Sequence, residues 1–313
     1  MNSKILITGI AGFLGTNLAL RLLQNGQRVL GIDDLCSGSS KNLALLKKHP
    51  EFSFIHQDIC NPIVLPMPIK QIYNLACPAS PPMYQKIPLH TLKTCSIGIF
   101  NLLDLAKQHN ADVLQASTSE VYGDPEESPQ SETYWGRVNP VGPRACYDEG
   151  KRFAEALITN FAKQEKINCK IVRIFNTYGP HMRSDDGRVV SNFIMQALQN
   201  LPLTIYGDGN QTRSLCFVDD LMTALIATMQ HKKKLPGPIN LGRSSEVTVL
   251  ELANLIIKLT ASKSTVQFFP LPENDPCKRL PDTRLTRKIL NWEATTDLEH
   301  GLTQTIKYFS DKL

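Results

Sequence analysis

The sequence predicts an α/β fold, in which a smaller lobe is interleaved with a doubly wound parallel sheet. Three observations lead to this prediction. Short apolar runs of strand length alternate with longer segments of helical periodicity, as in parallel sheets whose crossovers are helices. Three glycines mark the turn between the first strand and the first helix. Beyond Phe175 the alternation becomes mixed, which favours a second, smaller unit.

The first element is a short β-rich run over Ile5–Ile7, typical of a buried parallel strand. A helix follows and stops near Gly26, because apolar side chains recur there at helical spacing, at Leu14, Leu18, Leu22 and Leu23. The run "RVLGI" then predicts a second strand that ends at Asp33.

The turn between the first strand and helix carries Gly9, Gly12 and Gly15 in a G-x-x-G-x-x-G pattern. Glycines let the backbone turn sharply and approach a pyrophosphate at the helix N-terminus. Asp33 can accept hydrogen bonds from a ribose diol and would repel a 2′-phosphate, which favours NAD over NADP. The alternative is that Asp33–Asp34 is only a turn. The pattern predicts a Rossmann-like unit.

The alternation continues through the middle of the chain. Helical patterns cover about Thr91–Gln108 and Tyr147–Gln164. They separate further candidate strands at Phe52–His56, Gln71–Leu75, Val113–Ser117 and Lys170–Phe175. The predicted dinucleotide-binding unit is residues 1–177, to which 215–239 returns, and the smaller lobe is mainly 178–313.

Ligands of such sheets lie at the carboxyl ends of the strands. This rule gathers several residues around one crevice, together with the segment after Phe175: Asp58, Leu75, Ala76, Thr118, Ser119 and Glu120. The stretch "CPASPPMYQKIP" holds four prolines, which predicts an irregular loop over the same crevice.

The stretch "RACYDEGKR" places Tyr147 and Lys151 four residues apart, on one face of the predicted helix. A lysine beside a phenol can make the phenol a usable base. Taken alone, the pair is more often an ordinary solvated helix face. Thr118 at the end of a strand would bring a hydroxyl to the same place, beside a nicotinamide.

At this point the chain resembles the extended short-chain dehydrogenase/reductases, and within them the UDP-glucuronate decarboxylases, or UDP-xylose synthases. The resemblance covers about residues 4–293 and is most specific from Ser117 to Arg152. It rests on the glycine-rich start, on Y-x-x-x-K, and on "NLACPASPPMYQKIPLHTLKT", "STSEVYGD", "RIFNTYGP", "DGRVVSNFI", "YGDGNQTR" and "DPCKRLPD".

The resemblance implies oxidation of UDP-glucuronate at sugar C4 by bound NAD, loss of carbon dioxide from the β-keto acid, and reduction by the same NADH to UDP-xylose. Tyr147 would take the C4 hydroxyl proton, with its pKa lowered by Lys151 and the positive nicotinamide. Thr118 would align the C4 oxygen. Glu120 would act in decarboxylation, either charged beside the substrate carboxylate or protonated as a donor, and a structural acid at the strand end is the alternative.

The same resemblance implies further contacts. Arg279 would lie in the active site, and Arg213 would bind the diphosphate. Asn176, Arg188, Lys93 and Asn101 would contact substrate or fold over it, although each also suits an ordinary structural role. The cofactor-binding set would be Gly9, Gly12, Phe13, Leu14, Gly15, Asp33, Asp34, Asp58, Leu75, Thr94, Tyr147, Lys151 and Thr177.

Ser119 separates the near relatives. It occupies the place of an aspartate in sugar-nucleotide 4,6-dehydratases, while 4-epimerases usually lack an acid at the position of Glu120. Both comparisons favour decarboxylation over the alternative enzymes, and the Tyr147–Lys151 pair argues against a non-catalytic NAD-binding regulator. Asp34, Ser37 and Phe161 depart from the family pattern. Of these, Phe161 replaces a tyrosine near substrate in some members.

The bulk properties exclude several classes. The net charge is +5, without a basic stripe, so a nucleic-acid partner is not expected. No apolar run approaches the length of a membrane span, and no leader precedes the first strand. The eight cysteines form no C-x-x-C pair, so we expect neither a metal site nor disulfides. Scattered free thiols also predict a cytoplasmic location. By resemblance, helices near 91–108 and 147–164 would pair two subunits through a four-helix bundle.

Overall fold

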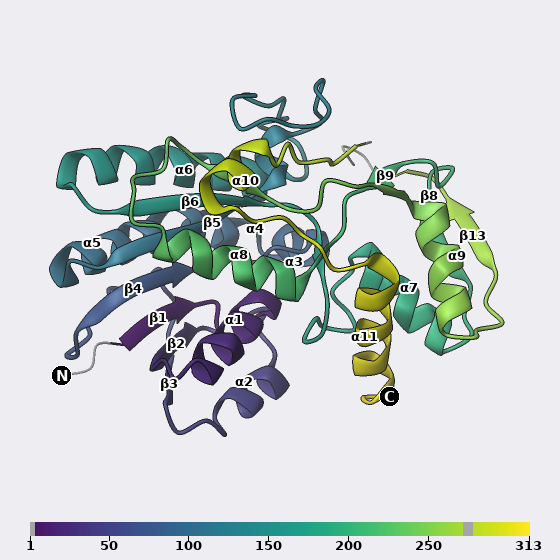
Figure 1. The fold of residues 1–313 in the computed structure, drawn as a ribbon, viewed down its shortest axis with the longest axis horizontal. Helices are drawn as coiled ribbons and strands as arrows, with labels where there is room; N and C mark the ends of the chain where they lie inside the picture. Colours follow the sequence, from purple (N-terminus) through teal and green to yellow (C-terminus); the bar gives the residue numbers. More distant parts are fainter. Residues whose placement is uncertain (1–3, 272–277) are drawn as a thin grey trace.

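The computed structural model describes residues 4–271 and 278–313 of the chain. A large parallel sheet with helices on both faces makes up most of the molecule, and a smaller lobe adjoins the carboxyl ends of its strands (Figure 1). The predicted doubly wound α/β fold is confirmed. Among the described helices, none is both long and apolar enough to cross a membrane.

The main sheet has seven parallel strands in the order β11-β6-β5-β4-β1-β2-β3. In register, Leu6 lies beside Leu30 on one side and Ile72 on the other. The bounds are β1 (Lys4–Thr8), β2 (Val29–Asp33), β3 (Phe52–His56), β4 (Ile69–Asn74), β5 (Asp112–Thr118), β6 (Cys169–Ile174) and β11 (Ile239–Leu241). All the strands predicted from the sequence are present, with ends shifted by one or two residues.

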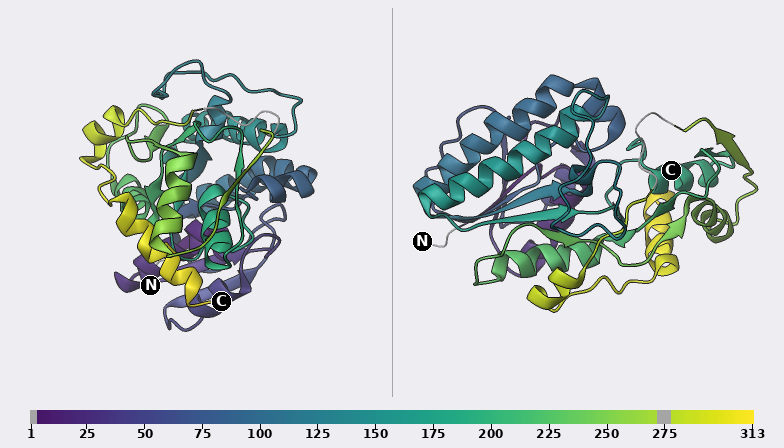
Figure 2. Two further views of the ribbon diagram at one scale, coloured as in Figure 1. Left: turned by 90° about the vertical axis from the view of Figure 1, so that its right-hand side faces the viewer. Right: turned by 90° about the horizontal axis from the view of Figure 1, so that it is seen from above.

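The two faces of the sheet are covered by different helices because side chains alternate along each strand. Ile5 and Ile7 face α1 (Phe13–Gln24) and α8 (Val218–Gln230), whereas Leu6 faces α5 (Ile99–His109). The longest helix, α6 (Ala145–Glu165), lies beside α5 on the second face (Figure 2). A short helix, α2 (Ser40–Leu46), follows β2.

The smaller lobe is built around a parallel strand pair and three helices. The pair is β8 (Leu203–Tyr206) with β13 (Val266–Phe269). The helices are α7 (Val189–Leu198), α9 (Val249–Leu259) and α11 (Leu298–Ser310), and two-residue strands complete the lobe: β7 (Thr177–Tyr178), β9 (Thr212–Arg213), β10 (Cys216–Phe217) and β12 (Val247–Thr248). The apolar core of this lobe is continuous with the core under α1 and α8.

The chain crosses between the two parts more than once. α8 packs on the main sheet and β11 forms its edge, although both follow β8 in sequence. α10 (Arg284–Leu290) then returns to lie against β11. The nominal boundary at residue 177 falls within the short strand β7.

The prediction of an irregular loop at "CPASPPMYQKIP" is wrong. The segment forms α3 (Pro81–Lys86) and the start of α4 (Pro88–Lys93). Pro81 and Pro88 stand at helix starts, where the missing N–H has no partner to lose and the fixed φ suits the helix. Likewise, the single helix predicted over Thr91–Gln108 is α4, then a π-helical turn, η1 (Thr94–Gly98), and then α5.

Candidate active site

The glycine-rich turn has room for glycine alone at its key positions. Gly9 has φ +68°, and a Cβ there would lie 2.7 Å from the Leu75 carbonyl oxygen. A Cβ at Gly15 would collide with the Gly9 carbonyl oxygen, and one at Gly12 would lie 3.2 Å from the same atom. The turn therefore packs directly on the end of β4 and leads into α1, with Phe13 and Leu14 in its first turn. This is the cradle that a dinucleotide pyrophosphate requires.

Asp33 lies at the end of β2 beside this turn, as predicted. Its buried carboxylate accepts hydrogen bonds from the backbone N–H of Ala11 (2.9 Å) and of Leu35 (2.8 Å). Burial raises the pKa of Asp33, and these two hydrogen bonds oppose the rise. The carboxylate thus fixes the glycine-rich turn and faces the crevice.

The crevice lies between the glycine-rich turn, the end of β4 and helix α4. Its lining includes the predicted residues Gly9, Gly12, Asp33, Asp34, Asp58, Leu75, Ala76 and Thr94. It also includes Cys77 and His90, which the sequence did not indicate. Thr177 is outside this lining and donates its hydroxyl to the Phe175 carbonyl instead.

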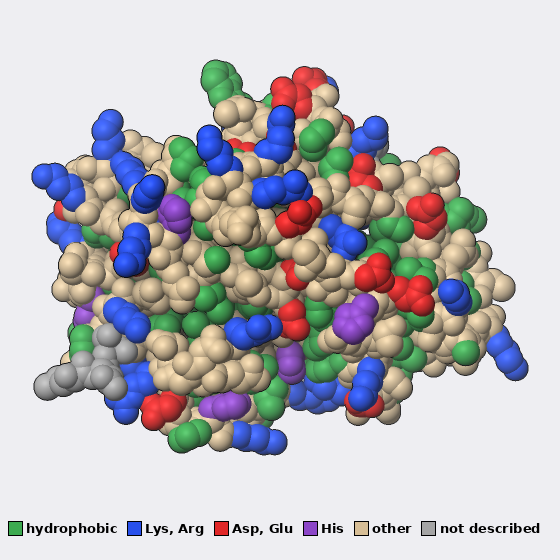
Figure 3. Space-filling view, in the orientation of Figure 1, with side chains coloured by type: hydrophobic (Ala, Val, Ile, Leu, Met, Phe, Trp, Pro, Cys, Tyr) green, Lys and Arg blue, Asp and Glu red, His purple; other side chains and the backbone are tan. Residues whose placement is uncertain are grey.

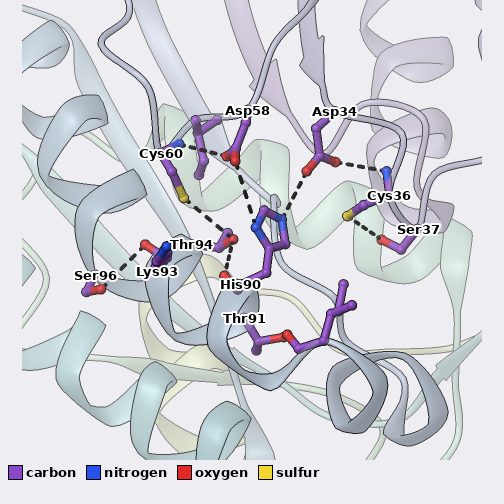
Figure 4. Close-up of polar contacts among 12 residues, drawn as sticks. Asp34, Cys36, Ser37, Asp58, Cys60, His90, Thr91, Lys93, Thr94 and Ser96 are labelled. Carbon is purple, nitrogen blue, oxygen red and sulfur yellow. Dashed lines mark hydrogen bonds and ion pairs between the residues drawn. The ribbon is translucent and has the colours of Figure 1, made fainter.

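His90 was not predicted, although it sits at the centre of the crevice wall. Its Nε2 lies 3.0 Å from Asp34 and its Nδ1 lies 3.8 Å from Asp58, so the ring stands between the two carboxylates (Figure 4). Asp34, which departs from the family pattern, therefore has a histidine partner. Cys36 and Cys60 complete two sets of metal-type donors that share His90. Spacing along the chain could not indicate these sets, because three separate segments contribute to them.

Tyr147, Lys151 and Thr118 meet at the carboxyl end of β5. The Thr118 hydroxyl lies near enough to the Tyr147 hydroxyl to favour the phenolate, and Lys151 Nζ lies 5.7 Å from the centroid of the Tyr147 ring. Lys151 Nζ donates to the Ala116 carbonyl oxygen at 2.8 Å. The solvated-helix alternative is excluded, since Tyr147 and Lys151 are both buried.

The pKa of Tyr147 is raised in the protein alone, whereas the predicted lowering includes the charge of a bound nicotinamide and stays a prediction. Burial raises the pKa of Tyr147, the neighbouring Cys77 raises it further, and the hydrogen bond from Thr118 offsets only part of this rise. Helical spacing brings Lys151 near the ring, but its ammonium group donates to a backbone carbonyl and not to the phenol.

Tyr84 of α3 is a neighbour that sequence reasoning missed. Its ring stacks on Tyr147, with centroids 5.0 Å apart and an interplanar angle of 5°. Its hydroxyl is buried and has no hydrogen-bond partner among the described residues. The helix that replaces the expected proline loop is what places this tyrosine over Tyr147.

Glu120 is clamped between arginines. Arg279 donates to both carboxylate oxygens, at 3.3 Å from Nε and 3.2 Å from Nη2, and Arg144 makes a short ion pair with the same group. Burial would raise the pKa of Glu120, but Arg279 and Arg144 outweigh it and hold the pKa at about 2. The carboxylate is therefore charged at neutral pH. Arg144 was not predicted, because nothing in its local sequence marks it.

Asp148 is a second acid beside Glu120, one residue after Tyr147. It is buried, and its Oδ1 has no hydrogen-bond partner among the described residues. Burial raises the pKa of Asp148 to about 7, and the charge on Glu120 adds to the rise while Arg144 opposes it. The two adjacent acids therefore differ in protonation near neutral pH.

The remaining predicted residues differ in how close they lie to this site. Ser119 is buried at the start of a 3-10 turn, η2 (Ser119–Tyr122). Arg188 and Arg213 lie near enough to act electrostatically on Tyr147 and Glu120, respectively. Asn176, just after β6, is partly buried, and its carbonyl accepts from the Cys216 N–H.

Three residues expected near the substrate lie elsewhere in the structure. Asn101 donates to the Ile59 carbonyl at 2.8 Å and so holds the loop below the crevice. Lys93 is exposed at the end of α4 and does not line the crevice. Phe161, which replaces a tyrosine near substrate in some relatives, packs between α5 and α6, about 21 Å along the helix from Tyr147 at 1.5 Å per residue, and so lies away from the site.

Known proteins share this fold and much of this sequence. A family model described as GDP-mannose 4,6 dehydratase matches residues 6–305. The protein from Danio rerio named UDP-glucuronic acid decarboxylase 1 is 49% identical, over 99% of this chain and 73% of its own length. The chain belongs to the extended short-chain dehydrogenase/reductase family.

Two solved members of the family superimpose over nearly the whole chain. UDP-glucose 4-epimerase of Thermotoga maritima, solved with UDP-glucose, gives a TM-score of 0.90 at 27% identity and covers 99% of both chains. UDP-glucuronic acid 4-epimerase of Bacillus cereus, solved with UDP-glucuronic acid and NAD, gives 0.86 at 28% identity and covers 99% of this chain and 100% of the other. The family membership predicted from the sequence is confirmed.

Proposed function

We propose that the protein is an NAD-dependent carboxy-lyase that converts UDP-glucuronate to UDP-xylose and carbon dioxide. The observation that carries this proposal is Glu120, a charged carboxylate clamped by Arg279 and Arg144 beside the Thr118, Tyr147 and Lys151 set. The 49% identity to a protein named UDP-glucuronic acid decarboxylase 1 supports the same reaction.

The crevice fits NAD. Gly9, Gly12 and Gly15 leave the space that a side chain would fill, and Phe13 and Leu14 follow at the start of α1. Asp33 and Asp34 suit the adenosine ribose, since a carboxylate accepts hydrogen bonds from both hydroxyls. The remaining contacts are assigned to Asp58, Leu75, Thr94 and Thr177. When bound, NAD supplies a hydride acceptor for sugar C4 and later returns the hydride.

Tyr147 is assigned the proton transfer at the C4 oxygen. Its hydroxyl lies near that of Thr118, which lowers the pKa of Tyr147, so both hydroxyls can act on the sugar oxygen. Lys151 is assigned the nicotinamide ribose and the field that favours the phenolate. Because burial raises the Tyr147 pKa in the protein alone, the base becomes effective only when positive charge accompanies the bound ligands.

Glu120 is assigned the charged role in decarboxylation. Oxidation at C4 makes a β-keto acid, and the C5–carboxyl bond breaks as the ketone accepts its electron pair. A fixed negative charge near the substrate carboxylate raises the ground-state energy of that anion, and the energy is released when neutral carbon dioxide leaves. With a pKa of about 2, Glu120 does not carry the proton that the enolate takes at C5.

Arginines are assigned to the anionic substrate. Arg279 is 2% exposed, and its Nη1 is buried with no partner among the described residues, so one N–H group remains to bind a carboxylate or phosphate. Arg213 and Arg188, with Asn176, are assigned to the UDP moiety in the smaller lobe. Lys93 and Asn101 are assigned supporting roles at the rim and floor of the crevice.

The runner-up reaction is 4-epimerisation, which the names of both solved family members favour. The test is incubation of the purified protein with UDP-glucuronate carrying deuterium at sugar C4, without added NAD, and mass spectrometry of the products. We expect UDP-xylose that retains the deuterium, because the hydride returns to the carbon it left.

Each competing activity gives a different product. An epimerase returns a nucleotide sugar of unchanged mass, and a 4,6-dehydratase releases water from UDP-glucose or dTDP-glucose. A non-catalytic NAD-binding regulator leaves all three substrates intact. Any of these results in place of carbon dioxide release contradicts the proposal.

We also propose a cytoplasmic homodimer. Apolar side chains are exposed on the outer faces of the paired helices, at Leu92 on α4, Ile97 on η1, Phe100 on α5 and Phe153 on α6. A four-helix bundle with a second copy would bury them.

The free thiols of all seven described cysteines suit a reducing compartment. Lys and Arg are scattered over the face in Figure 3, which suits a small-molecule ligand.

A further inference from the structure

Two cysteines from separate segments lie in contact beside the crevice. Cys77 follows the end of β4, and Cys95 lies in the π-helical turn η1. Their Sγ atoms are 3.5 Å apart, and either thiol can donate to the other. Sequence reasoning treated both as scattered thiols, because seventeen residues and two short helices separate them.

The two thiols have different access. Cys95 is buried, and its side chain packs against Gly150 of α6, where a Cβ would lie 3.1 Å from Cys95 Cβ. Cys77 is half-buried and lines the crevice next to Leu75 and Ala76. A small reagent that enters the crevice therefore reaches Cys77 first, with Cys95 directly behind it.

The surroundings favour one thiolate in the pair. The hydrogen bond from Cys77 lowers the pKa of Cys95, burial opposes this, and the Lys151 ammonium adds to the lowering. The same hydrogen bond raises the pKa of Cys77, so Cys95 carries the thiolate and Cys77 keeps its proton. Thiolates, and not thiols, attack oxidants and disulfides.

We propose that Cys77 and Cys95 form a reversible disulfide when the protein meets a peroxide, and that this disulfide weakens cofactor binding in the crevice. This proposal concerns the thiols themselves and does not depend on which nucleotide sugar the protein converts.

The chemistry balances with hydrogen peroxide as the oxidant. Cys77 passes its thiol proton to the Cys95 thiolate as the Cys77 sulfur attacks one peroxide oxygen. The O–O bond breaks, and the hydroxide that leaves takes that proton from Cys95 to become water. The Cys95 thiolate then attacks the sulfur of the Cys77 sulfenic acid. The S–S bond forms, the S–O bond breaks, and the hydroxide that leaves takes a proton from solvent to become the second water. Two thiols are oxidised by two electrons, and one peroxide is reduced to two waters.

The bond must displace the wall of the crevice. A disulfide requires the two sulfurs to approach to about 2.05 Å, whereas they now lie 3.5 Å apart. Cys95 is held against Gly150, so the Cys77 segment has to move toward η1. That segment is continuous with Leu75 and Ala76, whose backbone atoms lie within 2.8 Å of the position of a Cβ on Gly9. The glycine-rich turn therefore loses the surface on which it packs.

The test is oxidation of the purified full-length protein with hydrogen peroxide, followed by a tryptic digest without reductant. Trypsin cleaves after Lys86 and Lys93 and so places the two cysteines in separate peptides. We expect one cross-linked peptide pair that joins Cys77 to Cys95, with a loss of two hydrogen atoms. Dithiothreitol should separate the pair.

Cofactor binding provides the second readout. We expect NAD to bind about tenfold or more weakly to the oxidised protein, because displacements near 1 Å disturb a site to at least this degree. NAD at about ten times its Kd should slow the cross-linking about tenfold, since only unbound protein then exposes Cys77. The Cys169→Ser variant is the matched control and should behave as the native protein does.

Several results would overturn the proposal. One is sulfinic acid at Cys77 without a cross-link, and another is a cross-link between Cys95 and the nearby Cys146. Equal loss of NAD affinity in Cys95→Ser after peroxide treatment would show that a different group is responsible. Unchanged NAD affinity in the cross-linked native protein would contradict the proposal that the disulfide weakens cofactor binding. The digest of the native protein decides the first half even if a serine variant does not fold.

Discussion

Lys151 lies over the ring of Tyr147 but directs its hydrogen bond to the Ala116 carbonyl and not to the phenol oxygen. The Thr118 hydroxyl is the neighbour that lowers the pKa of the phenol instead. Lysine and tyrosine thus share one helix face without a direct bond, and the Tyr147 hydroxyl remains available to a sugar hydroxyl.

Tyr147→Phe should remove activity and leave the fold intact. General bases contribute about 10²–10⁴-fold to turnover, so we expect kcat to fall by at least about a hundredfold. Cofactor binding and the thermal unfolding midpoint should change little, because the ring keeps its stack on Tyr84. Tyr206→Phe, an exposed tyrosine in β8, is the control. A Tyr147→Phe variant that keeps more than a tenth of native turnover would contradict the assignment.

Glu120→Gln should destabilise the protein at neutral pH, because it leaves two arginines facing an uncharged group. The pKa of Glu120 is lowered to about 2, so its stabilising effect is fully present above the unfolded-state pKa and is lost as pH falls through about 2. We expect the free energy of unfolding to fall by about 1–3 kcal/mol at pH 7. Turnover should also fall.

The matched control for this change is Glu126→Gln. Glu126 pairs with Arg137 at 2.9 Å, and both side chains are more than two-thirds exposed. Urea unfolding at pH 7 should show a change of less than about 0.5 kcal/mol for this variant. If the two substitutions lower the free energy of unfolding equally, the buried ion pairs of Glu120 do not stabilise the fold more than an exposed pair does.

Asp148→Asn should stabilise the protein above neutral pH. The pKa of Asp148 is raised to about 7, so the folded state favours the protonated carboxyl. The free energy of unfolding therefore falls as pH rises from the unfolded-state pKa of Asp148 to about 7. Asparagine removes this loss. The gain in unfolding free energy should be near zero below pH 4 and on the order of 1–3 kcal/mol above pH 7.

Thermal unfolding across pH 4–8 checks this behaviour. Glu149→Gln, whose carboxylate is 37% exposed and 3.6 Å from Arg152, should show no comparable dependence on pH. If the difference in unfolding temperature between Asp148→Asn and the native protein does not change over this pH range, Asp148 is not protonated as assigned.

Gly15→Ala should disrupt the cofactor cradle, because its Cβ would collide with the Gly9 carbonyl oxygen. We expect a stability loss of about 1–3 kcal/mol and a large loss of NAD affinity, measured by calorimetry and thermal unfolding. Gly237→Ala is the control, since nothing lies within 4 Å of its Cβ position. Native NAD affinity in Gly15→Ala would show that the turn does not hold the cofactor.

Phe153→Glu should give a monomer if α6 forms the subunit interface. The Phe153 side chain is 47% exposed on α6, and Phe100 is exposed on the adjoining helix α5. A charge at the centre of an apolar contact opposes association. Light scattering after size exclusion measures the mass. Phe268→Glu, on β13 in the smaller lobe, should remain dimeric, and a dimeric Phe153→Glu protein would reject this interface.

The features that could be predicted from sequence are those fixed by local physics. Gly9, Gly15 and Asp33 are such features, because a strand, a tight turn and a helix leave few residue choices. Tyr147 and Lys151 are together because helical spacing alone places them on one face.

The features that were missed depend on contacts between distant segments. His90 stands between Asp34 and Asp58, and Arg144 reaches Glu120, only after the sheet has assembled. The Tyr147 pKa could not be predicted because it is set by burial, which spacing does not report. The proline-rich helices were misread for another reason, since proline breaks a helix in its interior but is well suited to its first turn.

The order of the strands has a consequence for synthesis on the ribosome. β6 ends at Ile174, but its edge neighbour β11 begins only at Ile239, and Arg279 follows later still. A growing chain that has already made Glu120, Tyr147 and Lys151 therefore still exposes an open sheet edge and lacks one of the arginines that hold the acid. The nascent protein cannot begin its chemistry early, because about the last quarter of the chain has to emerge before the parts made first can work together.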